Sequence, residues 1–492
     1  MSLSSELGAL VAADIVRSVP AVSEDEYEFR HALIQEAAYH EILKEDRTSL
    51  HRAVGEALER LHSANLDQVA PELAFHFRRA GDKDRAVVYL VRAAHLAAKG
   101  FANDEALANL EEALELVEED DPRTGGVHEQ IGDICLLTGR QDEALNRFRL
   151  AAGLATSTLD EARRERKAGA CFPMGPDFDM PLGHLQRAAD LLGSEPFDDE
   201  ATWWHEWIQI RIGRGFVLYF ASGSPELRSQ LTDLLEQIQG PLARWGTPQQ
   251  RAQYYIDCAG PFRFRLDGMG PSDTMLEIAL EGVEAADASG DVRLVGRSRF
   301  ILGLCRLTRS ELDEAVRAFT EGARICDSIG DAEWSCRSLT YLAIAYRRLG
   351  DLQGVRDALE RAEPLVGRPG FGLYRGASLA NRAWLSWRSG DTTEAARSFD
   401  EAEKVWAEHN VPYPFAWIAA LPAISIALDG DDLDTAVRHA AHLVGLPFGR
   451  ALPEEVMDLL RSGVEEAGAG RVDEARRALE LSLERAAEAG YL

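Results

Sequence analysis

Apolar residues recur at helical spacing through the second half of the chain, in blocks that return every forty residues. Each block begins at a turn residue and continues as an amphipathic helix, for example "SELDEAVRAFTEGARICDSIGD". The turn residues are Gly270, Ser310, Gly350, Gly390, Gly430 and Gly470. Twelve positions later stand mostly small residues, as expected where two helices approach closely: Gly282, Gly322, Ala362, Ala402, His442 and Ser482.

Twenty positions into each block, the sequence favours a residue that can end a helix in the left-handed conformation. These positions hold Gly290, Gly330, Gly370, Asn410, Arg450 and Gly490. Because Arg450 and His442 depart from the pattern, we expect the block that starts at Gly430 to be the most distorted. Further apolar helices such as "AEWSCRSLTYLAIAYRRL" lie between the amphipathic ones. Each block is therefore an antiparallel helix pair, and the pairs must stack into an all-α solenoid to bury their apolar faces.

The earlier part of the chain is also helical in pattern, with weaker periodicity. The segment "TGRQDEALNRFRLAAGLA" resembles the later blocks, but between about 160 and 265 the forty-residue register is lost. Within that stretch, "CFPMGPDFDMPLGH" at 171–184 has three prolines and two glycines and is predicted to be a loop. The segment "TWWHEWIQIRIGRGFVLYF" is apolar enough for a buried helix.

Two groups of segments carry a family resemblance. "GDLQGVRDALERAE" and "GRVDEARRALELS" resemble tetratricopeptide repeats of slightly extended length. "YEFRHALIQEAAYHEIL" (Tyr27 to Leu43) and "RTSLHRAVGEALE" (Arg47 to Glu59) resemble the winged-helix end of the ATPase core in signal-transduction ATPases of the STAND class. The resemblance implies that His31 senses nucleotide in the parent protein, and the alternative is a packing or capping histidine. It also implies an upstream ATPase module.

Together these patterns predict four segments. Residues 1–65 form the winged-helix-like end of an ATPase core, and 66–160 form the first tetratricopeptide-like repeats. Residues 161–265 form an irregular helical section, and 266–492 form the repeats of forty residues. The expected fold class is an all-α, tetratricopeptide-like solenoid with a small winged-helix-like segment at its N-terminal end.

Charge and composition exclude several classes of function. The formal net charge of −29 opposes nucleic-acid binding, which depends on basic residues that neutralise phosphates. None of the five lysines follows a glycine, so no phosphate-binding P-loop is present and ATP hydrolysis is not expected of this chain. No apolar run approaches the ~20 residues of a membrane span. The six scattered cysteines favour reduced thiols and a cytoplasmic location.

Candidate catalytic and metal-binding patterns are weak. His205 and Glu206 begin a zinc-protease motif, but Gln209 stands where its second histidine would be. "LDGDDLD" at 428–434 resembles a calcium loop without the distal glutamate, so capping of the next helix is the favoured role. Asp177, Asp179 and His184 share a segment, and solvated side chains are favoured over a metal site there. We therefore expect no enzyme activity, no metal and no cofactor.

The strongest candidate site is a row of arginines and aromatic residues on alternate helices. In tetratricopeptide solenoids these helices line the concave groove, and the neighbouring helices here carry the acidic residues. A basic groove lined with aromatic rings would attract an acidic peptide, an acidic protein or an anionic small effector. The alternative is that the arginines pair with acids of neighbouring helices and the aromatic rings belong to the core. Arg348 and Arg388, near the ends of their helices, are expected to be replaceable without loss of the fold. The candidate groove residues are Arg297, Arg337, Tyr341, Arg348, Tyr374, Trp384 and Arg388.

Together with the resemblance, the sequence therefore predicts a non-enzymatic sensor or scaffold region that binds a protein, peptide or small effector. The resemblance implies that this region regulates a STAND-type ATP-dependent regulator, expected to be transcriptional, as in LuxR-type proteins. One alternative is a regulatory region of a class III adenylate cyclase. Another is a stand-alone enzyme with an unrecognised site in 160–265.

Overall fold

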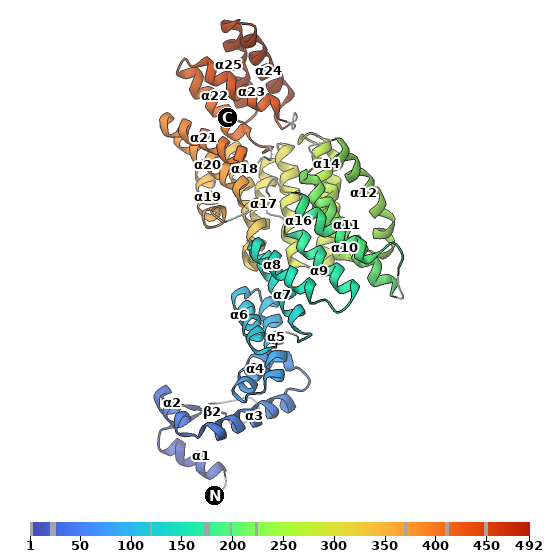
Figure 1. Cartoon of the computed structure of the whole chain (residues 1–492). Coiled ribbons are helices and arrows are strands. Elements are labelled where there is room, and N and C mark those ends of the chain that lie inside the picture. Colours follow the sequence, from blue (N-terminus) through green and yellow to red (C-terminus); the bar gives the residue numbers. More distant parts are fainter. Residues whose placement is uncertain are drawn as a thin grey trace. The chain divides into compact units, whose positions relative to one another are not determined.

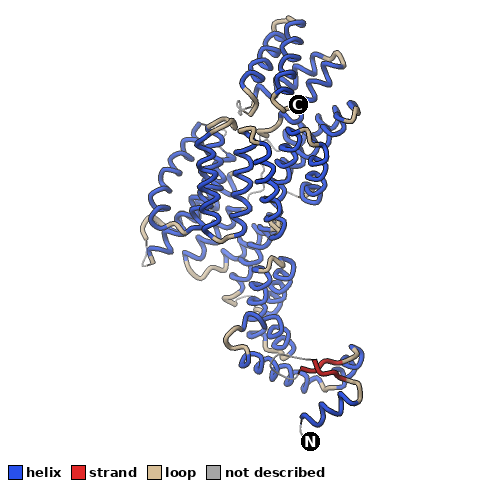
Figure 2. The backbone as a smooth tube through the Cα atoms, turned by 180° about the vertical axis from the view of Figure 1, so that it is seen from behind, coloured by secondary structure: helices blue, strands red, loops and turns tan. Residues whose placement is uncertain are grey.

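The computed structural model describes residues 3–19, 26–118, 121–171, 178–196, 199–221, 225–368, 371–408, 413–446 and 451–492. The chain divides into two compact units, Met1–Arg123 and Thr124–Leu492. Figures 1 and 2 show both units, and each is described by itself below. The segment boundaries expected after 65, 160 and 265 remain predictions.

The first unit contains the two strands of the described chain and seven helices. Its elements are α1 (Leu3–Ala12), β1 (Val16–Val19), β2 (Glu26–Phe29), α2 (Ala32–Glu41), α3 (Lys44–Leu61), the 3₁₀ helix η1 (Leu66–Val69), α4 (Ala70–Arg79), α5 (Lys83–Lys99) and α6 (Asn103–Leu116). The strands, red in Figure 2, pair antiparallel with Val16 opposite Phe29. The stretch that resembles a winged helix thus forms one strand, β2, followed by the two helices α2 and α3, and its winged-helix assignment stays a prediction.

The core of the first unit lies between α4, α5 and α6. Phe77 on α4 stacks on Tyr89 on α5 with ring centres 5.6 Å apart, and both side chains are buried. Gly55 on α3 faces the same ring, since a Cβ there would lie 2.9 Å from Phe77. By contrast, α2 buries none of its residues within the described part of the chain.

The second unit is built entirely of helices over its described residues. Its elements are α7 (Thr124–Leu137), α8 (Gln141–Gly153), α9 (Thr158–Ala170), α10 (Asp179–Leu192), α11 (Glu200–Ala221), α12 (Pro225–Trp245), α13 (Pro248–Gln253), the π-helix η2 (Tyr254–Ala259), α14 (Gly260–Leu266), α15 (Asp273–Ser289), α16 (Val292–Thr308), α17 (Leu312–Ile329), α18 (Ala332–Leu349), α19 (Leu352–Val366), α20 (Gly372–Arg388), α21 (Thr392–Glu408), α22 (Trp417–Asp429), α23 (Leu433–Gly445), α24 (Glu454–Gly468) and α25 (Val472–Glu488). Among the described residues, every helix of the chain is too short or too polar to cross a membrane.

Successive helices of the second unit pack as antiparallel neighbours, which gives the all-α solenoid that the sequence predicted (Figure 1). The row α16, α18, α20 and α22 differs from the other row, because its successive members also contact one another directly. Helices α17, α19 and α21 contact one another less. Closer spacing along one row is what bends a stack of helix pairs, so α16, α18, α20 and α22 form its inner row.

The chain turns between helices follow the predicted repeat with two local shifts. Gly290, Gly330 and Gly490 end their helices with positive φ, as predicted, whereas Gly370, Asn410 and Arg450 lie outside the described residues. The turn positions Gly350, Gly390 and Gly470 also have positive φ, and Ser310 adopts φ 61° in the same register. At Gly270 and Gly430 the left-handed residue is instead the neighbour, Met269 at φ 64° or Asp431 at φ 62°.

The shift at Gly430 leads to a stability prediction. Asp431 holds the left-handed conformation that costs a side-chain-bearing residue free energy, while the adjacent Gly430 does not use its freedom. The ion pair of Asp431 with Arg476 is largely solvent-exposed on the Asp431 side and contributes little. We expect Asp431→Gly to raise the free energy of unfolding by about 0.5–1 kcal/mol, measured by urea denaturation. A decrease in the free energy of unfolding would show that the lost contact with Arg476 outweighs the removal of backbone strain at position 431.

The section at 161–265 keeps the helix-pair arrangement with longer helices. The pairs α9–α10 and α11–α12 pack as neighbours, and the apolar segment around Trp203 forms the helix α11, as predicted. The prediction of one loop over 171–184 is wrong for Asp179–His184, which begins α10. Pro181 lies in the first turn of that helix, where proline removes no intrahelical hydrogen bond.

Candidate functional site

On α16 and α18, the first two helices of the inner row, two predicted groove arginines lie close to acidic and aromatic side chains. Arg297 Nη2 lies 2.9 Å from Asp331 Oδ2, and Arg337 pairs with Glu333. Both guanidiniums stack on Trp334, at 5.2 and 4.6 Å from its ring centre. Burial raises the pKa of Asp257, on the π-helix η2, to about 6, although Arg297 and Arg337 act on it in the opposite direction. These two arginines are therefore held by acids and an indole.

The predicted groove aromatics lie in the core. Tyr341, Tyr374 and Trp384 are 7%, 6% and 1% exposed and belong to the largest apolar cluster. Phe415, which precedes α22, covers Tyr341 with ring centres 5.1 Å apart in an edge-on contact. The inner face of α18 and α20 is thus filled by side chains at these positions, which agrees with the core alternative.

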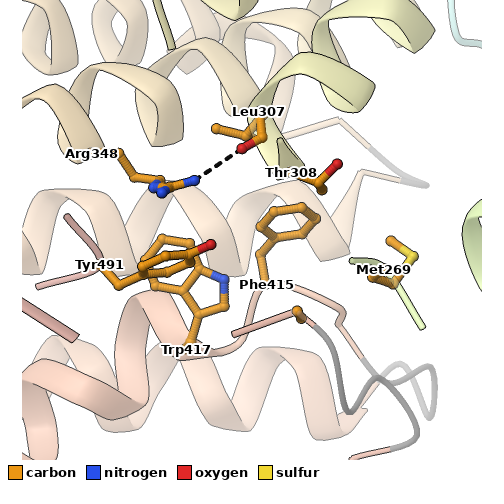
Figure 3. A pocket seen from close by; sticks show the side chains of 8 residues that line it. Met269, Leu307, Thr308, Arg348, Phe415, Trp417 and Tyr491 are labelled. Carbon is orange, nitrogen blue, oxygen red and sulfur yellow. Dashed lines mark hydrogen bonds between the residues drawn. The ribbon is translucent and has the colours of Figure 1, made fainter. Parts of the chain in front are cut away.

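Arg348 and Arg388 have different environments. Arg388 is exposed at the end of α20. Arg348 is 8% exposed and donates to Leu307 O at 2.9 Å, to Ser310 Oγ at 3.0 Å and to Ala489 O at 3.2 Å. Figure 3 shows the hydrogen bond to Leu307. The expectation that Arg348 is a readily replaced residue near a helix end is wrong, because it is buried and hydrogen-bonded to two distant segments.

The contacts of Arg348 join α18 to the last residues of the chain. Tyr491 lies over its guanidinium, 4.0 Å from ring centre to Cζ, and meets Trp417 edge-on at 4.9 Å. Figure 3 shows Phe415 and Trp417 beside this contact. The cavity that remains between them has a volume of about 10 Å³, room for a single water molecule.

Arg347, the neighbour of Arg348 on α18, is buried without a counterion. It is 2% exposed, and none of its three guanidinium nitrogens has a hydrogen-bond partner within the described residues. Its guanidinium lies 5.3 Å from the ring of Trp384 and 5.8 Å from that of Trp417. Burial lowers the pKa of Arg347 well below its ordinary value. A buried charge without a partner costs several kcal/mol, so this position is strained in the free protein.

Further buried polar groups without partners lie on α20 and α22, the helices that carry Trp384 and Trp417. Asn381 is fully buried, and neither its amide oxygen nor its amide nitrogen has a partner among the residues described. The same holds for Trp384 Nε1, Trp417 Nε1 and Ser378 Oγ. Ser378, Asn381 and Trp384 stand one turn apart along α20. We refer to Arg347, Ser378, Asn381, Trp384 and Trp417 as the Arg347 cluster.

Of the Arg347 cluster, sequence reasoning named only Trp384 as a site residue, although a signal for Arg347 and Asn381 was present. Arg347 follows Cys336, Thr340 and Ala343 at helical spacing, so it stands on an apolar face. Asn381 is likewise one turn from Ala377 and Trp384. A polar residue on an apolar helix face calls for a buried partner.

The predicted metal candidates have structural partners. Glu206 pairs with Arg166, and His184 Nδ1 lies 2.6 Å from Glu165 Oε2. Asp177 lies outside the described residues. Asp432 accepts from the backbone N–H of Thr435 and caps α23, which confirms the capping role predicted for the 428–434 segment.

One group of three residues has the spacing of a metal site in the described chain, namely Asp400, Glu403 and His439. His439 Nδ1 lies 3.0 Å from Glu403 and its Nε2 lies 3.8 Å from Asp400. Arg438 approaches Asp400 to 3.8 Å and supplies a competing cation. The group is accounted for by ion pairing between α21 and α23.

His31 stands at the start of α2, directly after β2. It is exposed, and its side chain makes no capping hydrogen bond. Neither the packing nor the capping role holds within this unit.

Comparison with known proteins gives only distant similarity. No family model matches the chain, and no curated protein matches it. Among solved structures, a Rap protein complexed with competence and sporulation factor is similar over 73% of this chain and 96% of that chain, with 15% identity and a TM-score of 0.48. The apo form of RapI is similar over 82% of this chain and 99% of that chain, with 10% identity and a TM-score of 0.41.

A STAND protein with a tetratricopeptide repeat sensor from Pyrococcus horikoshii is also similar, with 13% identity and a TM-score of 0.44. The similarity covers 83% of this chain and 59% of that chain.

Proposed function

We propose that the chain is a non-enzymatic sensor or scaffold region that binds an acidic peptide segment, of a protein or an effector, at the inner row of the second unit. The observation that carries the proposal is the unpaired guanidinium of Arg347. In a chain with 82 acidic residues, a buried arginine without a carboxylate partner is kept at a cost to stability. Binding of an anion would offset that cost.

The chemistry of the Arg347 cluster specifies the ligand. Its guanidinium, two indole N–H groups and one amide group are hydrogen-bond donors suited to a carboxylate. The amide oxygen of Asn381 needs a donor, which a peptide N–H can supply. A carboxylate beside a peptide group therefore satisfies the cluster better than an inorganic anion does. Because the cluster is enclosed, the helices of the inner row must part to admit it.

The proposal extends to what the chain regulates, namely a STAND-type ATPase. This extension rests on the sequence resemblance of Tyr27–Leu43 and on the surface of the first unit. Leu33, Leu43 and Leu61 are 79%, 73% and 68% exposed there, and the exposed His31 stands two residues before Leu33. An adjoining ATPase module would cover these apolar side chains and bring nucleotide to His31.

Substitution of Arg347 by methionine tests the binding proposal. Removing an unpaired buried charge is expected to raise the free energy of unfolding by about 1–2 kcal/mol, measured by urea denaturation. The same substitution should abolish binding of a fluorescein-labelled peptide of alternating glutamate and leucine, measured by anisotropy. Binding to the parent chain should weaken at higher ionic strength.

Two controls make the result specific. The same peptide with glutamine in place of glutamate should not bind, and Arg375→Gln, at an exposed position on α20, should change neither stability nor affinity strongly. If Arg347→Met lowers stability and leaves peptide binding intact, Arg347 is a structural residue and the proposal fails.

A further inference from the structure

A second polar site lies away from the inner row, between α10, α11 and α12. These helices line an open pocket of about 300 Å³, which is at the lower end of the size range of small-molecule sites. Arg211 and Arg214 on α11 line it together with the apolar side chains of Ile210 and Leu234. Gln230 and Gln237, both exposed on α12, add neutral hydrogen-bonding groups.

The two arginines are fixed by neutral groups. Arg211 Cζ lies 3.3 Å from the ring centre of Trp207, and Arg211 Nη1 donates to the carbonyl oxygen of Trp207 at 3.3 Å. Arg214 Nη1 donates to Gln186 Oε1 at 2.9 Å. Stacking on an indole and a hydrogen bond to an amide orient the guanidiniums without neutralising them.

No carboxylate of the described chain forms an ion pair with either arginine. Asp233 also lines the pocket and is exposed on α12. Burial and the nearby charge of Arg214 lower the pKa of Arg211 to about 10. Two positive charges in one pocket repel each other, in contrast to the paired arginines elsewhere in this acidic protein, such as Arg166 with Glu206.

We propose that this pocket binds a small organic dianion, a phosphate monoester or a dicarboxylate, with its charged group between Arg211 and Arg214. Two guanidiniums match a double negative charge, and each can donate two parallel hydrogen bonds to an oxyanion. Ile210 and Leu234 provide an apolar wall for the carbon skeleton, which distinguishes an organic ligand from an inorganic ion. The site is independent of the Arg347 cluster and shares no residue with it.

The test is isothermal titration calorimetry of the purified chain with glycerol 3-phosphate, succinate, inorganic phosphate and glycerol as probes. We expect at least one organic dianion to bind and glycerol not to bind. Arg214→Gln should weaken binding about tenfold or more, the loss of one charge-assisted contact. The variant with both Arg211→Gln and Arg214→Gln should show no binding.

A matched control and a stability readout complete the test. Arg244 on α12 also stacks on a tryptophan, with Cζ 5.0 Å from the ring centre of Trp245, but it does not line the pocket. Arg244→Gln and Arg347→Met should bind the dianion as the parent does. Arg214→Gln relieves repulsion, so its melting temperature without ligand should equal or exceed that of the parent. The proposal is overturned if neither organic dianion binds, if inorganic phosphate alone binds, or if Arg214→Gln binds as tightly as the parent.

Discussion

Replacing Gly376 by alanine is expected to lower the free energy of unfolding by about 3 kcal/mol. Gly376 is buried on α20, and a Cβ there would overlap Trp406 Nε1 and lie 2.7 Å from Cδ1 of the same ring. Trp406 cannot move away freely, because its Nε1 donates to Leu373 O at 2.9 Å and its ring stacks on Tyr413. Overpacking costs about 1–3 kcal/mol and the lost hydrogen bond about 1 kcal/mol more. Urea denaturation measures the sum.

A second glycine serves as the matched control. Gly183 lies inside α10, and a Cβ at this position meets no atom within 4 Å. Alanine is the better helix former, so Gly183→Ala should raise the free energy of unfolding by about 0.5–1 kcal/mol. Equal effects of the two substitutions would mean that helix propensity, rather than the contact with Trp406, decides the response at Gly376.

The repeat architecture could be predicted because its determinants are local. A turn residue, an amphipathic helix and a helix-ending glycine recur at fixed spacing, and each acts within a few residues of its position. Gly282 and Gly322 were predicted to lie at close helix approaches, and a Cβ at either would come within 3.2 Å of a neighbouring segment. The tighter approach at Gly376 was not predicted, because Trp406 stands thirty residues away in a different helix.

The roles of the arginines could not be predicted, because they depend on distant segments. Arg347 and Arg348 are adjacent in one helix and are both buried, yet only Arg348 meets backbone carbonyls. One of those carbonyls belongs to Ala489, the C-cap residue that follows the last helix, α25. Helical spacing alone predicted that Arg297, Arg337 and Arg388 line one groove. In the structure Arg297 pairs with an N-cap aspartate and Arg337 with a glutamate of its own helix, whereas Arg388 is exposed and lies over the ring of Trp384.

The second large effect is expected at Glu129 on α7, which links that helix to α9. Arg163 donates to both of its carboxylate oxygens at 3.0 Å, Arg164 Nε donates at 3.1 Å, and Lys167 Nζ lies 2.8 Å away. Burial alone would raise the pKa of Glu129, but the hydrogen bonds from Arg163 and the charge of Lys167 lower it to about 2. Arg163 and Arg164 also pair with Asp160, and Lys167 with Asp133, but Glu129 is the carboxylate that contacts all three cations. Because Arg164 is also buried, loss of the Glu129 charge leaves a buried cation with fewer compensating contacts.

We expect Glu129→Gln to lower the free energy of unfolding by about 3 kcal/mol at pH 7, because the variant loses the stabilisation that holds the pKa of this carboxyl at about 2 in the folded protein. A carboxyl whose pKa is lower in the folded state stabilises the fold above its unfolded pKa, near 4.5, and loses that contribution as the pH falls toward 2. The difference between parent and variant should therefore be constant above about pH 5 and shrink below it. Urea denaturation at pH 7 and at pH 3.5 measures both values.

Glu143→Gln on α8 is the matched control for this pH dependence. Glu143 pairs with Arg140 at 3.4 Å and Arg147 at 3.9 Å, but more than a third of its side chain is exposed, so solvent screens both pairs. Its substitution should cost less than about 1 kcal/mol. If the stability loss caused by Glu129→Gln is the same at pH 7 and at pH 3.5, the electrostatic role of Glu129 is contradicted, because a loss of packing would not depend on pH. If the Glu129 carboxylate holds Arg163, Arg164 and Lys167 together, the difference in free energy of unfolding between parent and variant must shrink as Glu129 becomes protonated.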